Sequence, residues 1–238
     1  MLQPCQDNYS TTFDSYERMR RYHEKESAES LWRRCKVNEL HIEPLDKLSP
    51  LYETPSAFAA GVSRASIEDT AENLGLALQV EGAYYPVRST AYKSLLDRAK
   101  INGTALPKLS RQKLASVLND CLALYSAETL LLIRDEKISA THSGDSMDYS
   151  VLPIDELLKV LTRKLDDRFA GNVFQGGYCD HALAVASWSM PGQKEDLLGA
   201  YAKLLESKKK TALAAKLVPS IRFVTSDTGV ASAKVSAM

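Results

Sequence analysis

The most suggestive chemical groups of this chain lie in one short loop. His142, Ser143 and Asp145 supply an imidazole, a hydroxyl and a carboxylate, the three groups of a nucleophilic triad. Adjacency in sequence does not create triad geometry, and the G-x-S-x-G turn that presents a nucleophilic serine in many hydrolases is missing. Polar loops commonly use Ser and Asp side chains to bind their own backbone amides. We therefore expect a structural loop at residues 142–146 and assign no catalytic residue.

A second chemical pattern is the pair Cys179 and His181, which are zinc-ligand types two positions apart. A four-ligand site would require Cys35 and His41 to fold beside them, and the chain has no Cys-x-x-Cys pair. We therefore expect a buried thiol at Cys179, and neither a metal ion nor an organic cofactor.

Basic residues are concentrated near the end of the sequence, where residues 208–238 contain a single acid, Asp227. Cations close to phosphates release counterions, so this segment is a candidate for holding a nucleic-acid backbone. A run of lysines that closes a helix also stabilises the helix dipole, and that alternative stays open. The candidate nucleic-acid-binding residues are Lys208, Lys209, Lys210, Lys216 and Arg222.

Composition limits the class of protein. The 238 residues are 45% hydrophobic, and 30 Lys and Arg balance 30 Asp and Glu. These values exclude collagen, a coiled coil and wholesale disorder, and they give no global field that would attract a polyanion. No apolar run approaches the ~18–20 residues needed to span a bilayer, and the polar start lacks a signal-peptide pattern. We expect a cytoplasmic protein without a membrane partner, in which the four cysteines are reduced thiols.

The elements that must position these groups begin with a charged segment. Residues 13–36 are rich in Glu, Arg and Lys, lack Gly and Pro, and have only a thin apolar stripe, which predicts an exposed helix. Pro44, Pro50 and Pro55 then favour a linker at residues 41–57. We expect residues 1–57 to form a separable helical arm with this linker, and residues 58–238 to form the folded domain.

The remaining pattern predicts an α+β fold, in which a mixed or antiparallel sheet with hairpins is packed by amphipathic helices. Hairpins are expected around Glu81-Gly82 and Asp135-Glu136. Ser66 with Asp69 resembles a helix-starting capping box, and Ser110 is a second cap. Further helices are expected over 91–100, 111–125, 153–169 and 193–210, and strands over 181–190 and 218–229.

Four short segments occur in an order that resembles the DUF932 family of phage/plasmid-like proteins. They are the stretch from Tyr85 to Arg88 entering a helix, the helix at 111–122, the hairpin at 130–143 followed by Tyr149 and a helix, and the strand at 219–229. The resemblance covers about residues 75–238. The family-motif candidates are Arg88, Ser143, Tyr149, Ser226, Asp227 and Gly229. We also expect Ser226 and Asp227 to bind local amides in a turn for which Gly229 provides the permissive backbone.

The resemblance implies a mobile genetic element as the context and supplies no established catalytic residue. We expect non-enzymatic binding of nucleic acid, with DNA as the first candidate, or of a nucleoprotein complex. One alternative is a counter-defence protein that binds and inhibits a host protein through the charged N-terminal helix or an exposed edge. The other is an unrecognised hydrolytic enzyme built around Ser143, Asp145, Tyr149 or Ser226 with Asp227.

Overall fold

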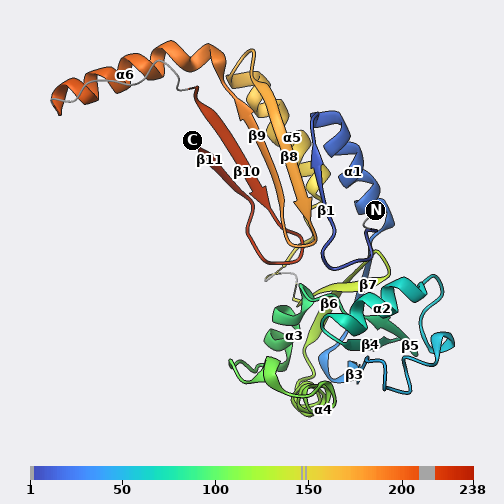
Figure 1. Ribbon diagram of the computed structural model, residues 1–238. Helices are drawn as coiled ribbons and strands as arrows, with labels where there is room; N and C mark the ends of the chain where they lie inside the picture. Colours follow the sequence, from blue (N-terminus) through green and yellow to red (C-terminus); the bar gives the residue numbers. More distant parts are fainter. Residues whose placement is uncertain (1–2, 146, 148, 209–217) are drawn as a thin grey trace.

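The computed structural model describes residues 3–145, 147, 149–208 and 218–238. These residues form an α+β protein with three antiparallel sheets, which confirms the expected class. Figure 1 shows the largest sheet in one part of the molecule and the two smaller sheets in the other. We call these parts the large-sheet lobe and the small-sheet lobe. Among the described residues, no helix combines the length and apolar character that crossing a bilayer requires.

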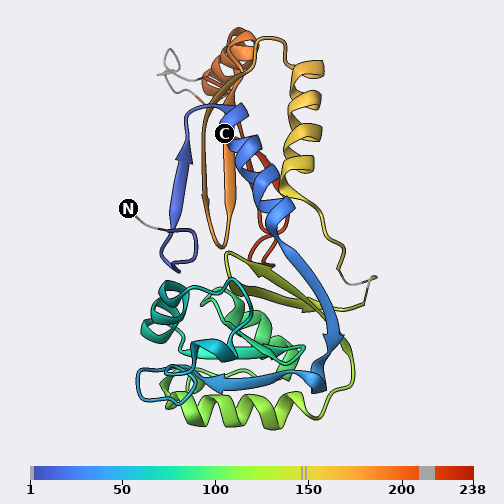
Figure 2. The ribbon, with the colours of Figure 1, turned by 90° about the vertical axis from the view of Figure 1, so that its right-hand side faces the viewer.

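The large-sheet lobe is built on five strands in the order β1-β8-β9-β10-β11. Helices α1 and α5 lie on the same side of this sheet (Figure 2), while α6 projects from its end (Figure 1). The elements are β1 (Ser10–Phe13), α1 (Tyr16–Glu29), α5 (Ile154–Arg168), β8 (Val173–Asp180), β9 (Ala184–Ser189), α6 (Lys194–Ser207), β10 (Ser220–Thr225) and β11 (Lys234–Ala237).

Burial alternates along β9 of the large sheet, because successive side chains point to opposite faces. In β9, Ala184, Ala186 and Trp188 are buried against α1 and α5, and the residues between them are only half-buried. Gly177 of β8 lies on the helix-covered face, where a side-chain Cβ would come within 2.5 Å of the Met19 sulfur. One face of this sheet therefore packs on helices, and no helix of the described residues covers the other, which we call the open face.

The small-sheet lobe contains two three-stranded sheets, with the orders β2-β6-β7 and β3-β4-β5. Its elements are β2 (Leu31–Lys36), β3 (His41–Pro44), α2 (Arg64–Glu72), β4 (Leu76–Val80), β5 (Ala83–Pro86), α3 (Ala91–Ala99), α4 (Arg111–Leu122), β6 (Glu128–Arg134) and β7 (Lys137–Ser143). Short 3-10 turns lie at Val37–Glu39, Pro55–Ala57 and Leu106–Lys108, and another, at Pro191–Gln193, precedes α6.

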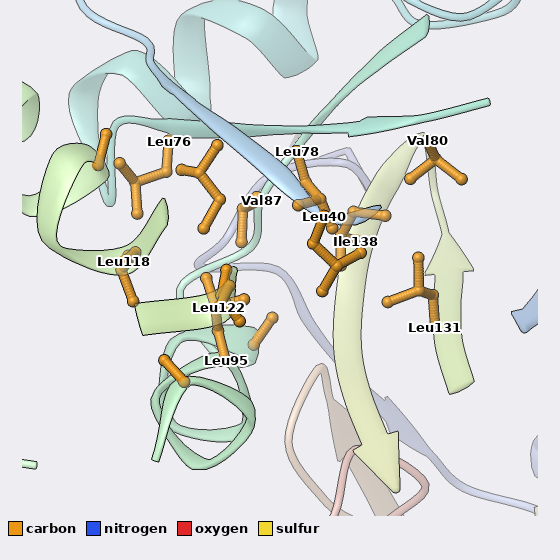
Figure 3. Packing of buried hydrophobic residues seen from close by; sticks show 14 of the residues in the cluster. Leu40, Leu76, Leu78, Val80, Val87, Leu95, Leu118, Leu122, Leu131 and Ile138 are labelled. Carbon is orange, nitrogen blue, oxygen red and sulfur yellow. The ribbon is translucent and has the colours of Figure 1, made fainter. Parts of the chain in front are cut away.

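The core of the small-sheet lobe packs α3 and α4 against strands of both sheets. Figure 3 shows Leu95, Leu118 and Leu122 from the helices facing Leu78 and Ile138 from the strands. All five side chains are fully buried. Replacing one such leucine by Ala typically lowers the unfolding free energy by about 2–5 kcal/mol. This core therefore holds α3 in its position on the sheets.

Several predicted elements are confirmed. The hairpins turn at Glu81-Gly82 and Asp135-Glu136, and Asp135 and Glu136 both have positive φ, as the tight hairpin turns require. Ser110 caps α4 by accepting a hydrogen bond from the Lys113 amide. These positions were predictable because their signals are local.

The predicted start of α2 is wrong by one turn. The N-cap is Ser63, which accepts a hydrogen bond from the Ser66 amide, so Ser66 and Asp69 lie inside the helix. The Glu136 carboxylate, which comes from the β6–β7 turn, accepts hydrogen bonds from the Ser63 amide and the Ser63 hydroxyl. A carboxylate at a helix start is favourable, and here it comes from a distant part of the chain.

The expected division of the chain at residue 57 does not match the strand pairing. Residues 1–57 contribute one strand to each sheet, since β1 pairs with β8, β2 with β6 and β3 with β4. The helix α1 is also not fully exposed, since its Met19 and His23 are buried. Instead of a helical arm with a linker, this segment is an integral part of both lobes.

Candidate functional site

Five of the six family-motif candidates come together where the two lobes meet. The backbone carbonyl of Asp227 accepts hydrogen bonds from His142 Nε2 at 2.8 Å and from the Tyr149 hydroxyl at 3.2 Å. Gly229 lies so close that a Cβ on it would be 3.3 Å from the His142 ring. Ser143 follows His142 at the end of β7, and Ser226 precedes Asp227.

Aromatic stacking fixes the side chains at this junction. The rings of His142 and Tyr149 are parallel, with centroids 3.8 Å apart, and Trp32 lies 5.8 Å from His142. Because a carbonyl can only accept, the imidazole proton is assigned to Nε2 of His142. Burial lowers the pKa of His142 and raises the pKa of Tyr149 to about 12, so both are neutral near pH 7.

The turn after β10 differs in one respect from its predicted chemistry. The Ser226 hydroxyl accepts hydrogen bonds from the Thr228 and Val230 amides, and Gly229 has φ of +79°, both as expected. The Asp227 carboxylate, however, is paired with the Arg134 guanidinium at the tip of β6 instead of with local amides. Asp227 therefore ties the turn of one lobe to a strand of the other.

Arg88, the sixth motif candidate, lies in a separate buried network. Its side chain is fully buried and donates to the backbone carbonyls of Gln6 and Pro4, each at 3.3 Å. Asp7 and Asp135 provide its ionic partners. Burial raises the pKa of Asp135 to about 6, against the opposing effect of Arg88.

The buried Lys137 extends this network. Its ammonium group is 3.1 Å from Asp7 and also pairs with Asp69 of α2. Burial acts to raise the pKa of Asp7, but Lys137 and hydrogen bonds from Ser89 outweigh it and hold the pKa below its usual value. The network joins the N-terminal segment to the small-sheet lobe, so we assign Arg88 a structural role.

In the loop that carries the three triad-type residues, side chains accept hydrogen bonds from backbone amides of the same loop, as expected. The Ser143 hydroxyl accepts a hydrogen bond from the Asp145 amide, and the Asp145 carboxylate accepts one from the Met147 amide. His142 and Ser143 are consecutive strand residues, which point to opposite faces of a sheet. Their side chains therefore leave the strand in opposite directions.

The four candidate zinc ligands are spread over all three sheets. Cys179 is buried in β8, Cys35 lies in β2 and His41 lies in β3. His181 Nε2 is 2.8 Å from the Gln6 carbonyl oxygen, and burial lowers the pKa of His181 to about 4. In the described part of the chain, no group of three or more His, Cys, Asp or Glu side chains is arranged to hold a metal ion.

The described members of the C-terminal basic set lie apart. Lys208 is the C-cap of α6, which projects away from the sheet, while Arg222 lies in the middle of β10 (Figure 1). Lys209, Lys210 and Lys216 lie outside the described residues. In the described structure, Lys208 and Arg222 therefore do not form a single basic patch.

Arg222 lies on the open face of the large sheet, the side opposite α1 and α5. It is paired in register with Ser187 of β9 and Ser236 of β11. Beside it is a hollow of about 490 Å³. The hollow is lined by Thr12, Phe13, Gly176, Gly177, Tyr178, Val185, Ser187, Arg222 and Met238. Among the residues that the structure describes, Arg222 has no hydrogen-bond or ion-pair partner.

A second concave region lies along α3 and was not anticipated from the sequence. It consists of two adjoining hollows of about 770 and 430 Å³, which share Arg98 and Ser143 as lining residues. Its basic lining residues are Arg34, Lys93, Arg98 and Lys100, and its acidic ones are Asp97, Glu128 and Asp145. We call this region the α3 groove. Lysine and arginine on an amphipathic helix are ordinary surface residues, so no sequence signal marked them.

Comparison with known proteins adds no assignment. No family model matches the chain, and no curated protein or solved structure matches it. Function is therefore inferred from the side chains and surfaces of this chain alone.

Proposed function

We propose that this protein binds nucleic acid and holds the sugar-phosphate backbone on the open face of the large sheet. The observation that carries the proposal is Arg222, an exposed guanidinium without a described partner beside a hollow in that face. A guanidinium offers several donors in a planar fork that fits phosphate oxygens. On this account the side chain is free because its partner is the ligand.

The charge of the open face favours an anionic ligand. Lys234 is on the same face as Arg222, because it is paired with Val224, two residues further along β10. The nearest carboxylate of β8, Asp180, is engaged by the Tyr178 hydroxyl at 2.8 Å and by the amides of Ala182 and Leu183. Two cations therefore stand on this face without a competing free carboxylate from that strand.

The shape of the open face suits a polymer. Thr12, Gly176 and Ser187 come from three adjacent strands and are small, so a ligand backbone can approach the sheet closely. The register of β8 on β9 shifts between Phe174 and Gly176, next to the Gly176 that lines this hollow. An extended, shallow and uncharged floor with cations beside it can hold a backbone without reading base sequence. The mobile-element context implied by the DUF932 resemblance is consistent with such binding and remains a prediction.

Fluorescence anisotropy of a labelled 20-nucleotide strand tests the proposal. We expect affinity to fall with salt, with a log–log slope of about −0.7 per contacted phosphate for a single strand. Arg222→Gln should weaken binding several-fold and flatten the slope by about one contact. The matched control is Arg33→Gln, which changes another exposed strand arginine, in β2 of the other lobe. Equal weakening by the two variants would contradict the assignment of the open face.

A second candidate function is binding of a host protein, and the observation that favours it is α6. None of its side chains that the structure describes is buried, and Tyr201 and Leu204 are 37% and 55% exposed. Apolar side chains on a projecting helix are typical of protein contacts. The charged helix α1 is a weaker candidate, because it packs on the large sheet. Capture of a host protein that is lost in Leu204→Glu, together with no nucleic-acid affinity at low salt, would favour this alternative.

A further inference from the structure

We infer that the α3 groove binds a phosphate-bearing small molecule, and that its ligand is a nucleoside phosphate. Most of the groove's lining residues belong to the small-sheet lobe, while Tyr149 and residues 228–230 of the turn after β10 line the far side of its smaller hollow. The groove shares no lining residue with the hollow beside Arg222. The inference therefore holds or fails independently of the nucleic-acid proposal.

Three cations that line the α3 groove have hydrogen-bond donors without a described partner. Arg98 Nε is buried without a hydrogen-bond partner. Lys93 and Lys100 are exposed and have no hydrogen bond or ion pair to a described residue. A buried donor without a partner is costly, and an anion that accepts from Arg98 removes this cost. Of these three cations, Lys100 lines the larger hollow, Lys93 lines the smaller one, and Arg98 lines both.

The opposite wall of the groove is fixed. Arg34 is paired with Glu128 at 2.9 Å and also donates to the Gly144 carbonyl. Gly144 approaches β6 so closely that a Cβ would lie 2.4 Å from the Glu128 carbonyl carbon. No other residue type fits there without displacing the backbone. The rim is therefore held in place before any ligand arrives, which lowers the entropic cost of binding.

Size and lining chemistry identify the class of ligand. The larger hollow, at about 770 Å³, is within the range of roughly 300–1,000 Å³ that is typical of small-molecule sites. Tyr125 offers an aromatic ring to a planar base, and the carboxylates of Glu128 and Asp145 can accept hydrogen bonds from sugar hydroxyls or amino groups. Arg98 and Lys100 are placed to contact phosphate. A nucleoside phosphate carries all three kinds of group.

The test is a binding titration on the full-length protein by calorimetry and thermal shift, with EDTA present. The probes are AMP, ATP, adenosine and inorganic phosphate. We expect AMP and ATP to bind and to raise the melting temperature, ATP more strongly, with adenosine and inorganic phosphate much weaker. Arg98→Gln and Lys100→Gln should each weaken AMP binding by about tenfold, the scale of one charge-assisted hydrogen bond. Lys113→Gln, an exposed lysine on α4, is the matched control and should bind as the wild type does.

Three results would overturn the inference. The first is no binding of AMP or ATP at millimolar concentration. The second is unchanged affinity in Lys100→Gln, a surface variant that keeps the fold even if Arg98→Gln does not. The third is inorganic phosphate binding as tightly as AMP, which would remove the nucleoside from the ligand. Because none of these involves the open face, nucleic-acid binding that depends on Arg222 could still stand.

Discussion

At the scale of single residues, this protein places charged side chains in its interior and pairs them with partners distant in sequence. Arg88 and Lys137 are fully buried and share Asp7, from the start of the chain. Burial of an ion is costly, so removal of one partner is far more damaging than loss of a surface pair. Their role is to hold the N-terminal segment against the small-sheet lobe.

The first residue-scale prediction concerns Asp135, whose pKa is raised to about 6 in the folded protein, from an ordinary value of 3.8. The folded state then holds the proton more tightly than the unfolded state, so stability from this group is complete below pH 3.8 and is lost as pH rises through 6. Asp135→Asn cannot titrate. The wild type should lose on the order of 2 kcal/mol of unfolding free energy through this group between pH 4 and pH 8, and the variant should not. The stability of the variant relative to the wild type should therefore rise by that amount over this pH range. Urea unfolding at both pH values measures this, and a pH-independent difference would contradict it.

The second residue-scale prediction concerns the turn after β10. Asp227→Ala leaves Arg134, which is 12% exposed, without its ion-pair partner, so we expect a loss of about 3 kcal/mol in unfolding free energy. Ser226→Ala removes only local hydrogen bonds of the hydroxyl, to the Thr228 and Val230 amides and to the Thr228 hydroxyl, and should cost about 1 kcal/mol. Equal losses in urea unfolding would show that the pair with Arg134 contributes little.

At the scale of elements, local signals were sufficient for part of the fold. The β6–β7 hairpin, α4 and α5 were predicted because turn residues, caps and helical periodicity all lie within the element itself. Strands β1, β2 and β3 were missed, since each has only four to six residues and their partners lie distant in the sequence. β2 also contains charged residues such as Arg33 and Arg34, and for this reason its segment was predicted as part of a helix.

The candidate sites divide in the same way. The family-motif residues were named from sequence, but their convergence on the Asp227 carbonyl depends on long-range packing of two lobes. Arg222 was named as a basic residue, and only the sheet register places it on an open face. Arg98 and Lys100 were not named, because nothing local distinguishes a groove cation from a solvated one.

The element-scale prediction concerns residues 1–57. A chain that begins at residue 58 loses β1, β2 and β3, and with them one strand of every sheet. We expect it to lack a cooperative thermal transition by circular dichroism, and we expect the full-length protein to resist limited proteolysis within residues 31–44. Cooperative unfolding of the shortened chain would contradict this prediction and would show that residues 1–57 are a separable arm.

At the scale of the whole molecule, the two lobes present different surfaces. The large-sheet lobe offers an open, shallow face beside Arg222, and the more enclosed α3 groove lies mainly on the small-sheet lobe, with the turn after β10 at its edge. The lobes are joined by the Arg134–Asp227 pair and by the N-terminal segment with its buried network. A polymer on the open face and a small ligand in the α3 groove would contact different residues, so both could bind at the same time.

The measurement that tests the proposed function most directly is a salt titration of single-strand binding by wild type, Arg222→Gln and Arg33→Gln. The triple variant of Lys208, Lys209 and Lys210 to Gln is the fourth arm, and it asks whether the lysine run adds contacts to those of the sheet. The account predicts measurable affinity at low salt, a flatter salt dependence for Arg222→Gln alone among the single variants, and weak sequence preference. No affinity at low salt, where electrostatic binding is strongest, or the same salt dependence in Arg222→Gln as in wild type, would contradict it.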